Sequence, residues 1–350
     1  MKFLAVDLIA NAPHLLTGHT PSQRDRFRRV VDNARYAEEL GFDAIGIGER
    51  HAPPFLSSSP PVVLAHLAAV TSRVRLVTTV TVLSLLDPVR VAEDYATLDH
   101  LSGGRLELIV GKGNDPHQSA LFGYDVSDQW ERNRENYELL RRLWREEEVT
   151  WSGTYRPALR GATTQPRPLQ RPTIPIWHGS ATSEESTELA ARWGDPLFSA
   201  NGFHPLEKYA ALVRHYRRRY EEHGHGPASS ALVGAGAGAS GLHLDRSSRR
   251  AVETFRPYYE AFTRTEGFRH NDSPFVTLED NIAGGPALVG SPQQVLEKIH
   301  LQHEAFGHQV LALGIEGFGL PEEQRRASLE LFFSEVAPVL RAELPSAVWP

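Results

Sequence analysis

The chain of 350 residues contains no cysteine and a single methionine. Without cysteine it has no disulfide framework, no thiolate nucleophile and no cysteine-ligated zinc or iron–sulfur centre. Its net charge is -6, and it has no basic stripe suited to a nucleic-acid backbone. It also lacks an apolar run of the roughly 20 residues that a membrane-spanning helix needs. These absences predict a cytoplasmic globular protein that binds neither nucleic acid nor a membrane.

Short β-like apolar runs alternate with longer amphipathic segments along the whole chain. This alternation is typical of parallel strands joined by crossover helices. Eight such runs occur, as a closed (β/α)8 TIM barrel requires, and residues 1–350 fit a single barrel domain with loop insertions. The expected strands are 3–9, 43–47, 74–82, 106–111, 173–179, 196–200, 230–238 and 309–315. The expected helices are 24–41, 60–71, 88–101, 128–147, 183–193, 205–223, 246–263, 292–306 and 322–341.

Three segments of unusual composition allow more than one interpretation. Residues 165–172 are rich in proline and could form a linker, but they lead straight into an expected strand, which favours a barrel insertion. The glycine- and alanine-rich stretch 234–241 could also be a linker, yet small residues in a strand mark close approach of a ligand or another backbone. Residues 267–285 are irregular and polar, and we expect a long active-site loop there.

Three motif-like segments fit well-known sites only in part. The spacing GxGxxG at Gly236–Gly241 is followed by LHLD rather than a helix start, which disfavours a Rossmann dinucleotide site. His303 and His308 are five residues apart, so they do not share a helix face as zincin ligands do, and we expect no metal site. Gly111-Lys112-Gly113 lacks the earlier glycine of a Walker loop.

Two segments are candidates for binding phosphate. Lys112 stands just past the fourth expected strand, on the barrel face where active sites form, although a lone lysine is more often a solvated charge. Residues 179–185 run from a strand end into a helix start, which offers backbone N–H groups and hydroxyls. A simple capping box between Thr182 and Glu185 is the other interpretation of that turn, and both can hold. Two anion sites on one face favour a phosphate-bearing cofactor.

Several long stretches resemble the bacterial luciferase-like monooxygenases. The most specific is PVRVAEDYATLDHLSGGR, because family members carry a closely similar run at this point. The fold implied by the resemblance is the eight-stranded barrel already expected. The matching stretches are GFDAIGIGERH (41–51), DPVRVAEDYATLDHLSGGRLELIVGKG (87–113), FG (122–123), PIWHGS (175–180), GSPQQVLEKI (290–299) and SLELFFSEVAPVLR (328–341).

The cofactor of that family is reduced FMN or, in one branch, the deazaflavin F420, and the resemblance implies which residues hold it. Lys112 matches the basic residue that meets the flavin phosphate. Gly179, Ser180 and Ser183 match the phosphate-binding turn. Arg132 falls near a second basic phosphate position, although it could equally be a surface arginine.

The resemblance also implies a seat for the flavin ring. Thr79 and Val80 match a bulge of the third strand, with a non-proline cis peptide, that lies under the isoalloxazine. Asn114 would lie close enough to reach a ring edge. His178 would face the pocket and donate to a flavin or substrate oxygen, or only cover the ring. Trp177 would then point the other way and pack as core.

The chain departs from luciferases proper after Glu49, where they carry two adjacent histidines and this sequence has Arg50 and His51. His51 is the best acid–base candidate, because an imidazole beside a carboxylate can titrate near neutral pH, while a structural histidine is the alternative. A guanidinium stays charged and can only donate. Arg50 could bind an anionic substrate, stabilise developing negative charge or pair with Glu49. We expect no light emission with a long-chain aldehyde.

The resemblance implies a monooxygenase in which reduced FMN and O2 oxidise a small organic substrate in a dry pocket. No convincing NAD(P)H fingerprint is present, so a separate NAD(P)H:flavin reductase is an expected partner, and the resemblance implies a homodimer. An F420-dependent hydride transferase and a flavin-binding barrel without catalysis are the alternatives. Substrate specificity is expected to reside in the loops 52–60, 114–127 and 264–289.

Overall fold

A closed barrel of parallel strands forms the centre of the computed structural model, which describes residues 1–237 and 241–349. Its strands are β1 (Lys2–Asp7), β2 (Ala44–Ile47), β3 (Arg75–Val82), β4 (Leu106–Gly111), β7 (Ile176–Ser180), β8 (Leu197–Ser199), β9 (Val233–Ala237) and β12 (Val310–Gly314). Their order round the barrel is β1-β12-β9-β8-β7-β4-β3-β2. The eight predicted strands and the TIM-barrel fold class are therefore confirmed.

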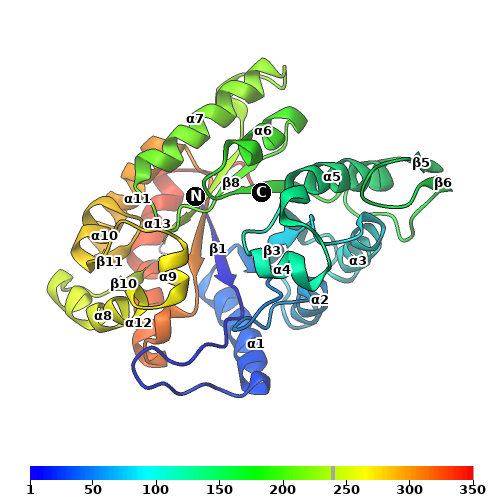
Figure 1. Cartoon of the computed structure of the whole chain (residues 1–350). Coiled ribbons are helices and arrows are strands. Elements are labelled where there is room, and N and C mark those ends of the chain that lie inside the picture. Colours follow the sequence, from blue (N-terminus) through cyan, green and yellow to red (C-terminus); the bar gives the residue numbers. More distant parts are fainter. Residues whose placement is uncertain (238–240, 350) are drawn as a thin grey trace.

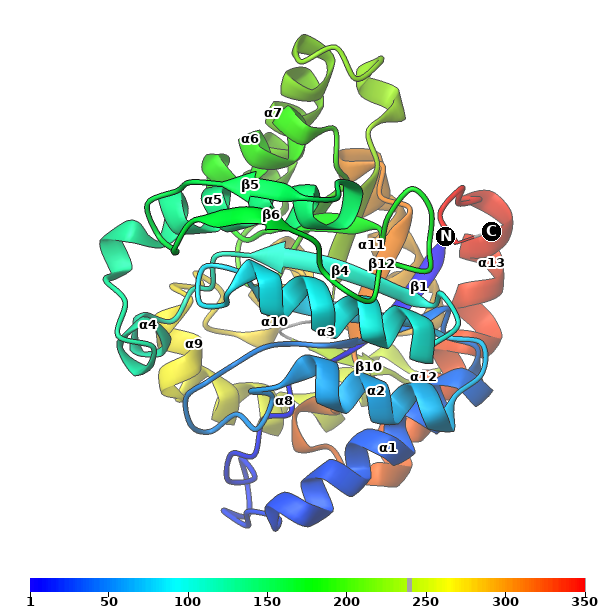
Figure 2. The ribbon, with the colours of Figure 1, turned by 90° about the vertical axis from the view of Figure 1, so that its right-hand side faces the viewer.

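Helices follow the strands and cover the outside of the barrel (Figures 1 and 2). The expected helix 322–341 is one exception in detail, because a π-helical turn, η4 (Phe332–Val336), divides it. Pro338 explains the division, since it has no N–H to donate to the carbonyl four residues earlier. Within the described residues, no helix is long and apolar enough to cross a bilayer. The main helices are α1 (Gln23–Leu40), α2 (Pro60–Val70), α3 (Pro88–Leu101), α5 (Gln129–Arg145), α6 (Glu184–Trp193), α7 (Leu206–Glu222), α8 (Ser248–Thr263), α11 (Pro292–Phe306), α12 (Glu322–Leu331) and α13 (Ala337–Glu343).

Shorter elements decorate the loops of the barrel. The expectation of one irregular loop over 267–285 is wrong, because two helices occupy much of it, each with a threonine cap, Thr265 or Thr277, that accepts a backbone N–H. A hairpin of β5 and β6 packs against α5 (Figure 2), and β10 pairs in parallel with β11. These elements are α4 (Pro116–Leu121), α9 (Glu266–His270), α10 (Leu278–Gly284), β5 (Val149–Trp151), β6 (Leu159–Ala162), β10 (Leu242–Leu244), β11 (Leu288–Gly290), η1 (Val126–Asp128), η2 (Ala228–Ser230) and η3 (Gly317–Gly319).

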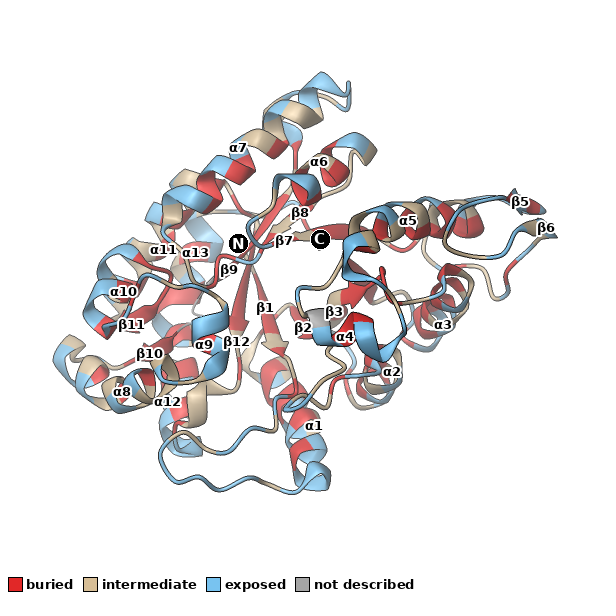
Figure 3. Ribbon diagram, in the orientation of Figure 1, coloured by how far each residue is buried: buried red, intermediate tan, exposed pale blue. Residues whose placement is uncertain are grey.

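Alternation along the strands separates the apolar side chains inside the barrel from those outside it, and Figure 3 shows the barrel strands almost wholly buried. Side chains that point outward, such as Phe3 and Leu108, pack against the helices, most of them in one large cluster. Side chains that point inward fill the barrel itself. This inner cluster includes Leu4, Ala44, Val77, Ile109, Trp177, Val310 and Ala312.

The glycine-rich stretch 234–241 begins as barrel strand β9, as predicted. Its glycines are required by close neighbours. A Cβ on Gly234 would lie 2.5 Å from the Phe198 ring, and one on Gly236 would lie 2.3 Å from the carbonyl oxygen of Ala200. The last residue of the expected strand, 238, and the middle of the GxGxxG spacing, 238–240, lie outside the described residues.

The amino-terminal end of the barrel, which we call the base, is closed by the tail of the chain. Trp349 and Trp177 donate their indole N–H groups to the carboxylate of Glu107, at 2.6 and 2.8 Å. Arg75 forms an ion pair with the same carboxylate at 2.8 Å. The amino group of Met1 donates to carbonyls at the end of α13, so both ends of the chain meet beside the base (Figures 1 and 2).

Candidate active site

The carboxyl ends of the strands form the opposite end of the barrel, which we call the mouth. In barrel enzymes this end carries the active site. β2, β3, β4 and β7 are neighbours, so the end of β3 lies between the segment that follows β2 and those that follow β4 and β7. These strand ends carry the predicted site residues Glu49, Arg50, His51, Thr79, Val80, Lys112, Asn114, Gly179 and Ser180.

The end of β3 is irregular, as expected. The Thr79–Val80 peptide is cis, and the pairing of β3 with β4 shifts register between Thr79 and Thr81. Two glycines give Val80 room, because Cβ atoms on Gly111 and Gly179 would lie 3.2 and 2.8 Å from its methyl carbons. The Thr79 hydroxyl is buried and has no hydrogen-bond partner among the described residues. It is a polar atom that a ligand could satisfy.

Lys112 follows β4 and is partly buried. Its ammonium donates to the carbonyl of Gly113 at 2.9 Å and to the amide oxygen of Gln129 at 3.4 Å, and it lies 5.4 Å from the centre of the Trp130 ring. Burial lowers the pKa of Lys112, and the Glu185 carboxylate opposes this shift. Both hydrogen-bond acceptors are neutral, so neither compensates the positive charge of the ammonium. This charge can therefore attract an anion.

The turn from β7 into α6 brings backbone N–H groups to the mouth beside Lys112. The predicted capping box is wrong, because α6 starts one residue later than that motif needs: Ser183, and not Thr182, is the N-cap. The Ser183 side chain makes no capping bond, and the Ser180 hydroxyl lies 3.5 Å from the Ser183 carbonyl. The first N–H groups of a helix lack intrahelical acceptors, so this end can hold an anion.

Glu49 and His51 form a dyad after β2. Oε1 of Glu49 lies 2.7 Å from Nε2 of His51, and Oε2 accepts the backbone N–H of Val82 at 2.9 Å. The two side chains are 1% and 10% exposed, and the Phe122 ring packs edge-on against the imidazole. Burial first, and the Glu49 charge second, raise the pKa of the nearby Tyr95 hydroxyl. A carboxylate that orients one imidazole nitrogen leaves the other to exchange a proton.

Arg50 does not pair with Glu49, so that interpretation of the arginine is wrong. Nη1 of Arg50 donates to Oδ1 of Asn114 at 2.6 Å, and the guanidinium lies 5.4 Å from the centre of the Phe55 ring. Burial lowers the pKa of Arg50, and the negative charge of Asp115 opposes this shift. Asn114 therefore contacts the arginine from the β4 side of the mouth.

Arg132 on α5 lies between two aromatic rings. Its guanidinium carbon is 3.9 Å from the centre of the Tyr124 ring and 4.6 Å from that of Tyr155. Its Nε is buried and has no hydrogen-bond partner within the described part of the chain. Arg132 is therefore partly buried and held between two rings, and its role in binding phosphate stays a prediction.

His178 and Trp177 occupy the opposite faces of β7 from those expected. Trp177 points into the barrel, where its indole N–H reaches Glu107. His178 lies outside the barrel wall, with its ring 4.6 Å from that of Tyr137 and its Nε2 3.2 Å from Asp195. Side chains do alternate between the two faces of β7. Which of them point into the barrel depends on these buried polar partners, and the sequence pattern does not reveal them. His178 is not a residue of the mouth.

Sequence reasoning missed the aromatic and amide groups that support the mouth. Gln129 and Trp130 contact Lys112, and Phe122 contacts His51. The sequence gives little sign of these contacts. It connects such a residue to a charged one only where the two lie close together along the chain, and not all of them do. Tyr155 gives no such signal, since it reaches Arg132 from the loop between β5 and β6.

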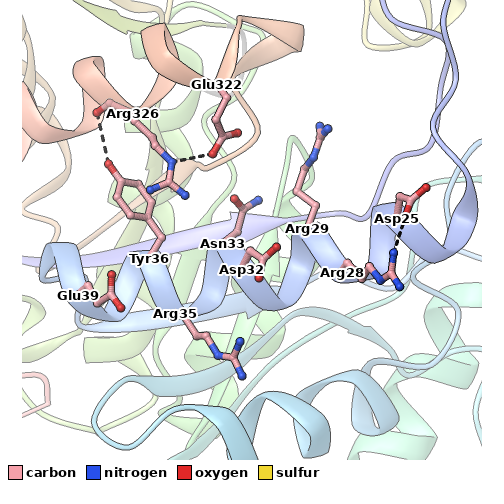
Figure 4. Close-up of a pocket in the computed structure, with 10 residues that line it drawn as sticks. All are labelled: Asp25, Arg28, Arg29, Asp32, Asn33, Arg35, Tyr36, Glu39, Glu322 and Arg326. Atoms are coloured by element: carbon pink, nitrogen blue, oxygen red, sulfur yellow. Dashed lines mark hydrogen bonds and ion pairs between the residues drawn. The ribbon is translucent and has the colours of Figure 1, made fainter.

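A separate groove of about 450 Å³ lies on the outer surface between α1 and α12 (Figure 4). Its charges largely neutralise one another: Arg28 pairs with Asp25 at 3.1 Å, and Arg326 pairs with Glu322 at 2.6 Å. The Tyr36 hydroxyl donates to the Arg326 carbonyl at 3.4 Å. This groove lies on the helical layer and contains none of the predicted site residues.

Comparison with known proteins identifies the family of the chain. The family model described as luciferase-like monooxygenase matches residues 1–309. The 4-hydroxyprotoasukamycin monooxygenase of Streptomyces nodosus subsp. asukaensis is 27% identical over 330 residues, which cover 90% of this chain and 87% of the relative. The oxygenase component of the flavin-dependent trigonelline monooxygenase of Acinetobacter baylyi is 24% identical over 336 residues, which cover 91% of each chain.

A solved structure extends the comparison to the fold. The oxygenating constituent of 3,6-diketocamphane monooxygenase from Pseudomonas putida, a type II Baeyer–Villiger monooxygenase in complex with FMN, matches with a TM-score of 0.79 and 21% identity. The match covers 97% of this chain and 98% of that chain. This likeness shows that the two chains share the barrel fold. The chain belongs to the luciferase-like monooxygenase family, which confirms the predicted resemblance and enzyme class.

Proposed function

We propose that this monooxygenase binds reduced FMN at the mouth of the barrel and oxidises a small organic substrate beside it. The proposal rests on two groups at the ends of neighbouring strands, each of which can bind a ligand. The buried Thr79 hydroxyl lacks a partner among the described residues at the end of β3. Next to it, the Lys112 ammonium stands beside the uncapped start of α6.

The mouth fits a flat ring above the end of β3. Gly314 ends β12 in the same inward row as Ala312, and a Cβ on it would meet no atom within 4 Å, so space above the inner core is open there. Thr79 would offer its hydroxyl to the polar edge of the ring. Val80 would support the ring from below, on the bulge that Gly111 and Gly179 permit.

The phosphate would bind between β4 and β7. Lys112 supplies a positive charge, Ser180 a hydroxyl and the start of α6 its unpaired N–H groups. Arg132, held by its two tyrosine rings, is the second cation of this seat. Ser183 also belongs to the proposed phosphate site, because its hydroxyl has only a weak contact with the Ser186 hydroxyl, at 3.4 Å.

Bound reduced FMN supplies the electrons with which O2 is activated. The protein supplies the proton transfer and the shielded pocket. Glu49 fixes the His51 ring through Nε2, so Nδ1 is the nitrogen that can give a proton to, or take one from, the reacting molecule. Phe122 and Phe55 flank this side of the mouth and offer apolar surface to a bound molecule.

Reduced flavin would come from a separate NAD(P)H:flavin reductase. The trigonelline enzyme is named as the oxygenase component of its system, which supports a two-component arrangement here. We also propose a cytoplasmic homodimer, on the family resemblance alone. Sedimentation of the purified protein would test its oligomeric state.

Anaerobic titration with FMN, before and after reduction by dithionite, tests the proposed function. We expect saturable binding of one reduced FMN per chain, and faster oxygen uptake when a reductase and NADH are added. Titration with reduced F420 in parallel is the discriminating control. Tight binding of F420 without binding of reduced FMN would overturn the proposal in favour of hydride transfer.

A further inference from the structure

Arg50 carries a positive charge at the mouth without a negative partner. One of its five N–H donors bonds the neutral oxygen of Asn114, and its face lies over the Phe55 ring. No carboxylate among residues 1–237 and 241–349 forms an ion pair with its guanidinium. The remaining donors of the guanidinium therefore have no acceptor among the described residues.

The nearby carboxylates are committed elsewhere. Both oxygens of Glu49 are engaged, one by His51 at 2.7 Å and one by the N–H of Val82 at 2.9 Å. Asp115 caps α4 through Oδ1, which accepts from both the backbone and the ring of His117, each at 3.0 Å, and it forms no ion pair with Arg50. It influences Arg50 only through its charge. An anion that pairs with Arg50 would therefore come from outside the described residues.

The position of Arg50 points to the substrate and not to the flavin phosphate. Arg50 follows β2, whereas Lys112 and Ser180 follow β4 and end β7, on the other side of β3. Asn114 fixes the guanidinium, and the His51 dyad lies next to it in sequence. Partial burial, which lowers the pKa of Arg50, also strengthens any contact with an anion because water screens it less.

We propose that the substrate of this monooxygenase is a carboxylate with an apolar body, and that Arg50 binds the carboxylate in its planar fork. The inference rests on the proposed function, because it assigns the substrate to the β2 side of the flavin seat. A single guanidinium matches a monoanion, and its two parallel donors match the geometry of a carboxylate. Phe55 and Phe122 provide apolar surface for the body.

Matched ligand pairs test this assignment in the FMN-loaded protein under anaerobic conditions. Benzoate and benzamide, and octanoate and octanamide, differ in charge but hardly in shape. We expect the wild type to bind at least one carboxylate about tenfold or more tightly than its amide, as measured by calorimetry. In Arg50→Gln the ratio should fall to about one, and Arg50→Lys, which keeps the charge without the fork, should lie between.

Arg249→Gln, at an exposed site on α8, is the matched control and should keep the wild-type ratio. Equal binding of carboxylate and amide in both pairs, or a preference that Arg50→Gln and Arg50→Lys retain, would overturn the proposal. The proposed function has a separate readout, because failure to bind reduced FMN would show in the flavin titration. The ligand ratio can still be measured in flavin-free protein.

Discussion

The base and the mouth of the barrel both bury polar groups, but they satisfy them differently. At the base, the Glu107 carboxylate receives two indole N–H groups and an ion pair from Arg75. At the mouth, the Thr79 hydroxyl has no partner among the described residues, and the Arg50 fork bonds one neutral amide. An unsatisfied buried group costs stability unless a ligand completes it. The Glu107 cluster of the base is complete within the fold, whereas the two polar groups of the mouth can be completed by a ligand.

Removing the carboxylate at the base should cause the largest loss of stability. Glu107→Ala leaves Arg75 and two indole N–H groups without their shared acceptor, so we expect about 3–5 kcal/mol less free energy of unfolding. Urea denaturation of the flavin-free protein measures it. Glu253→Ala, which breaks an exposed pair on α8, should change stability by less than about 1 kcal/mol. A Glu107→Ala protein as stable as wild type would contradict the division between base and mouth.

Removing the cation at the mouth should affect binding instead. Lys112→Ala deletes a charge-assisted contact with phosphate, so affinity for reduced FMN should fall about 10- to 150-fold, which corresponds to about 1.5–3 kcal/mol. Its free energy of unfolding should stay within about 1 kcal/mol of wild type. Lys208→Ala, an exposed lysine of α7, is the matched control for binding. If Lys112→Ala binds FMN as tightly as wild type, the phosphate seat is misplaced.

Acid should weaken the base side through His308, which precedes β12. Both ring nitrogens lack partners among the described residues, and burial lowers the pKa of His308 from 6.5 to about 3. The unfolded chain then binds the proton more readily than the folded protein does. The free energy of unfolding therefore has its full value above pH 6.5 and falls toward pH 3 by about 1.4 kcal/mol per pH unit. Denaturation at several pH values should show a shallower slope in His308→Leu, whereas His117→Gln at the surface should keep the wild-type slope.

The smallest effect is expected for the unpartnered hydroxyl. Thr79→Val keeps the shape, so the flavin-free protein should lose less than about 1 kcal/mol of stability or even gain some. Affinity for reduced FMN should fall by about 0.5–1.5 kcal/mol, the contribution of a neutral hydrogen bond. Thr97→Val on the exposed face of α3 should leave affinity unchanged. A large loss of stability in Thr79→Val would mean that the hydroxyl has a partner within the protein.

The barrel strands could be predicted because their signals are local. Each strand is a short apolar run, and each main helix has its own periodicity and cap, as Ser22 and Gly41 show for α1. Short elements escaped because their own sequence is insufficient to form them. The β5–β6 hairpin gains stability from packing on α5, and β10 gains it from pairing with β11, which lies far along the chain.

The candidate site was only partly predictable, for the same reason. The His51–Glu49 contact follows from two residues in one loop, and Lys112 from its place after a strand. The orientation of His178 was wrong because alternation fixes opposite faces without saying which face is inner. Arg50 does not pair with Glu49, and that carboxylate instead accepts the Val82 N–H, which the bulged strand β3 brings to it.

The meeting of the chain ends beside the base makes the barrel suitable for circular permutation. Met1 donates to the carbonyls of Leu340 and Leu344, so a short linker could join the old termini. New termini could open at residues 224–226, an exposed turn between α7 and β9. The segments that follow β2, β3, β4 and β7 would stay intact. The mouth therefore depends on closure of the strand ring, and not on where the polypeptide starts.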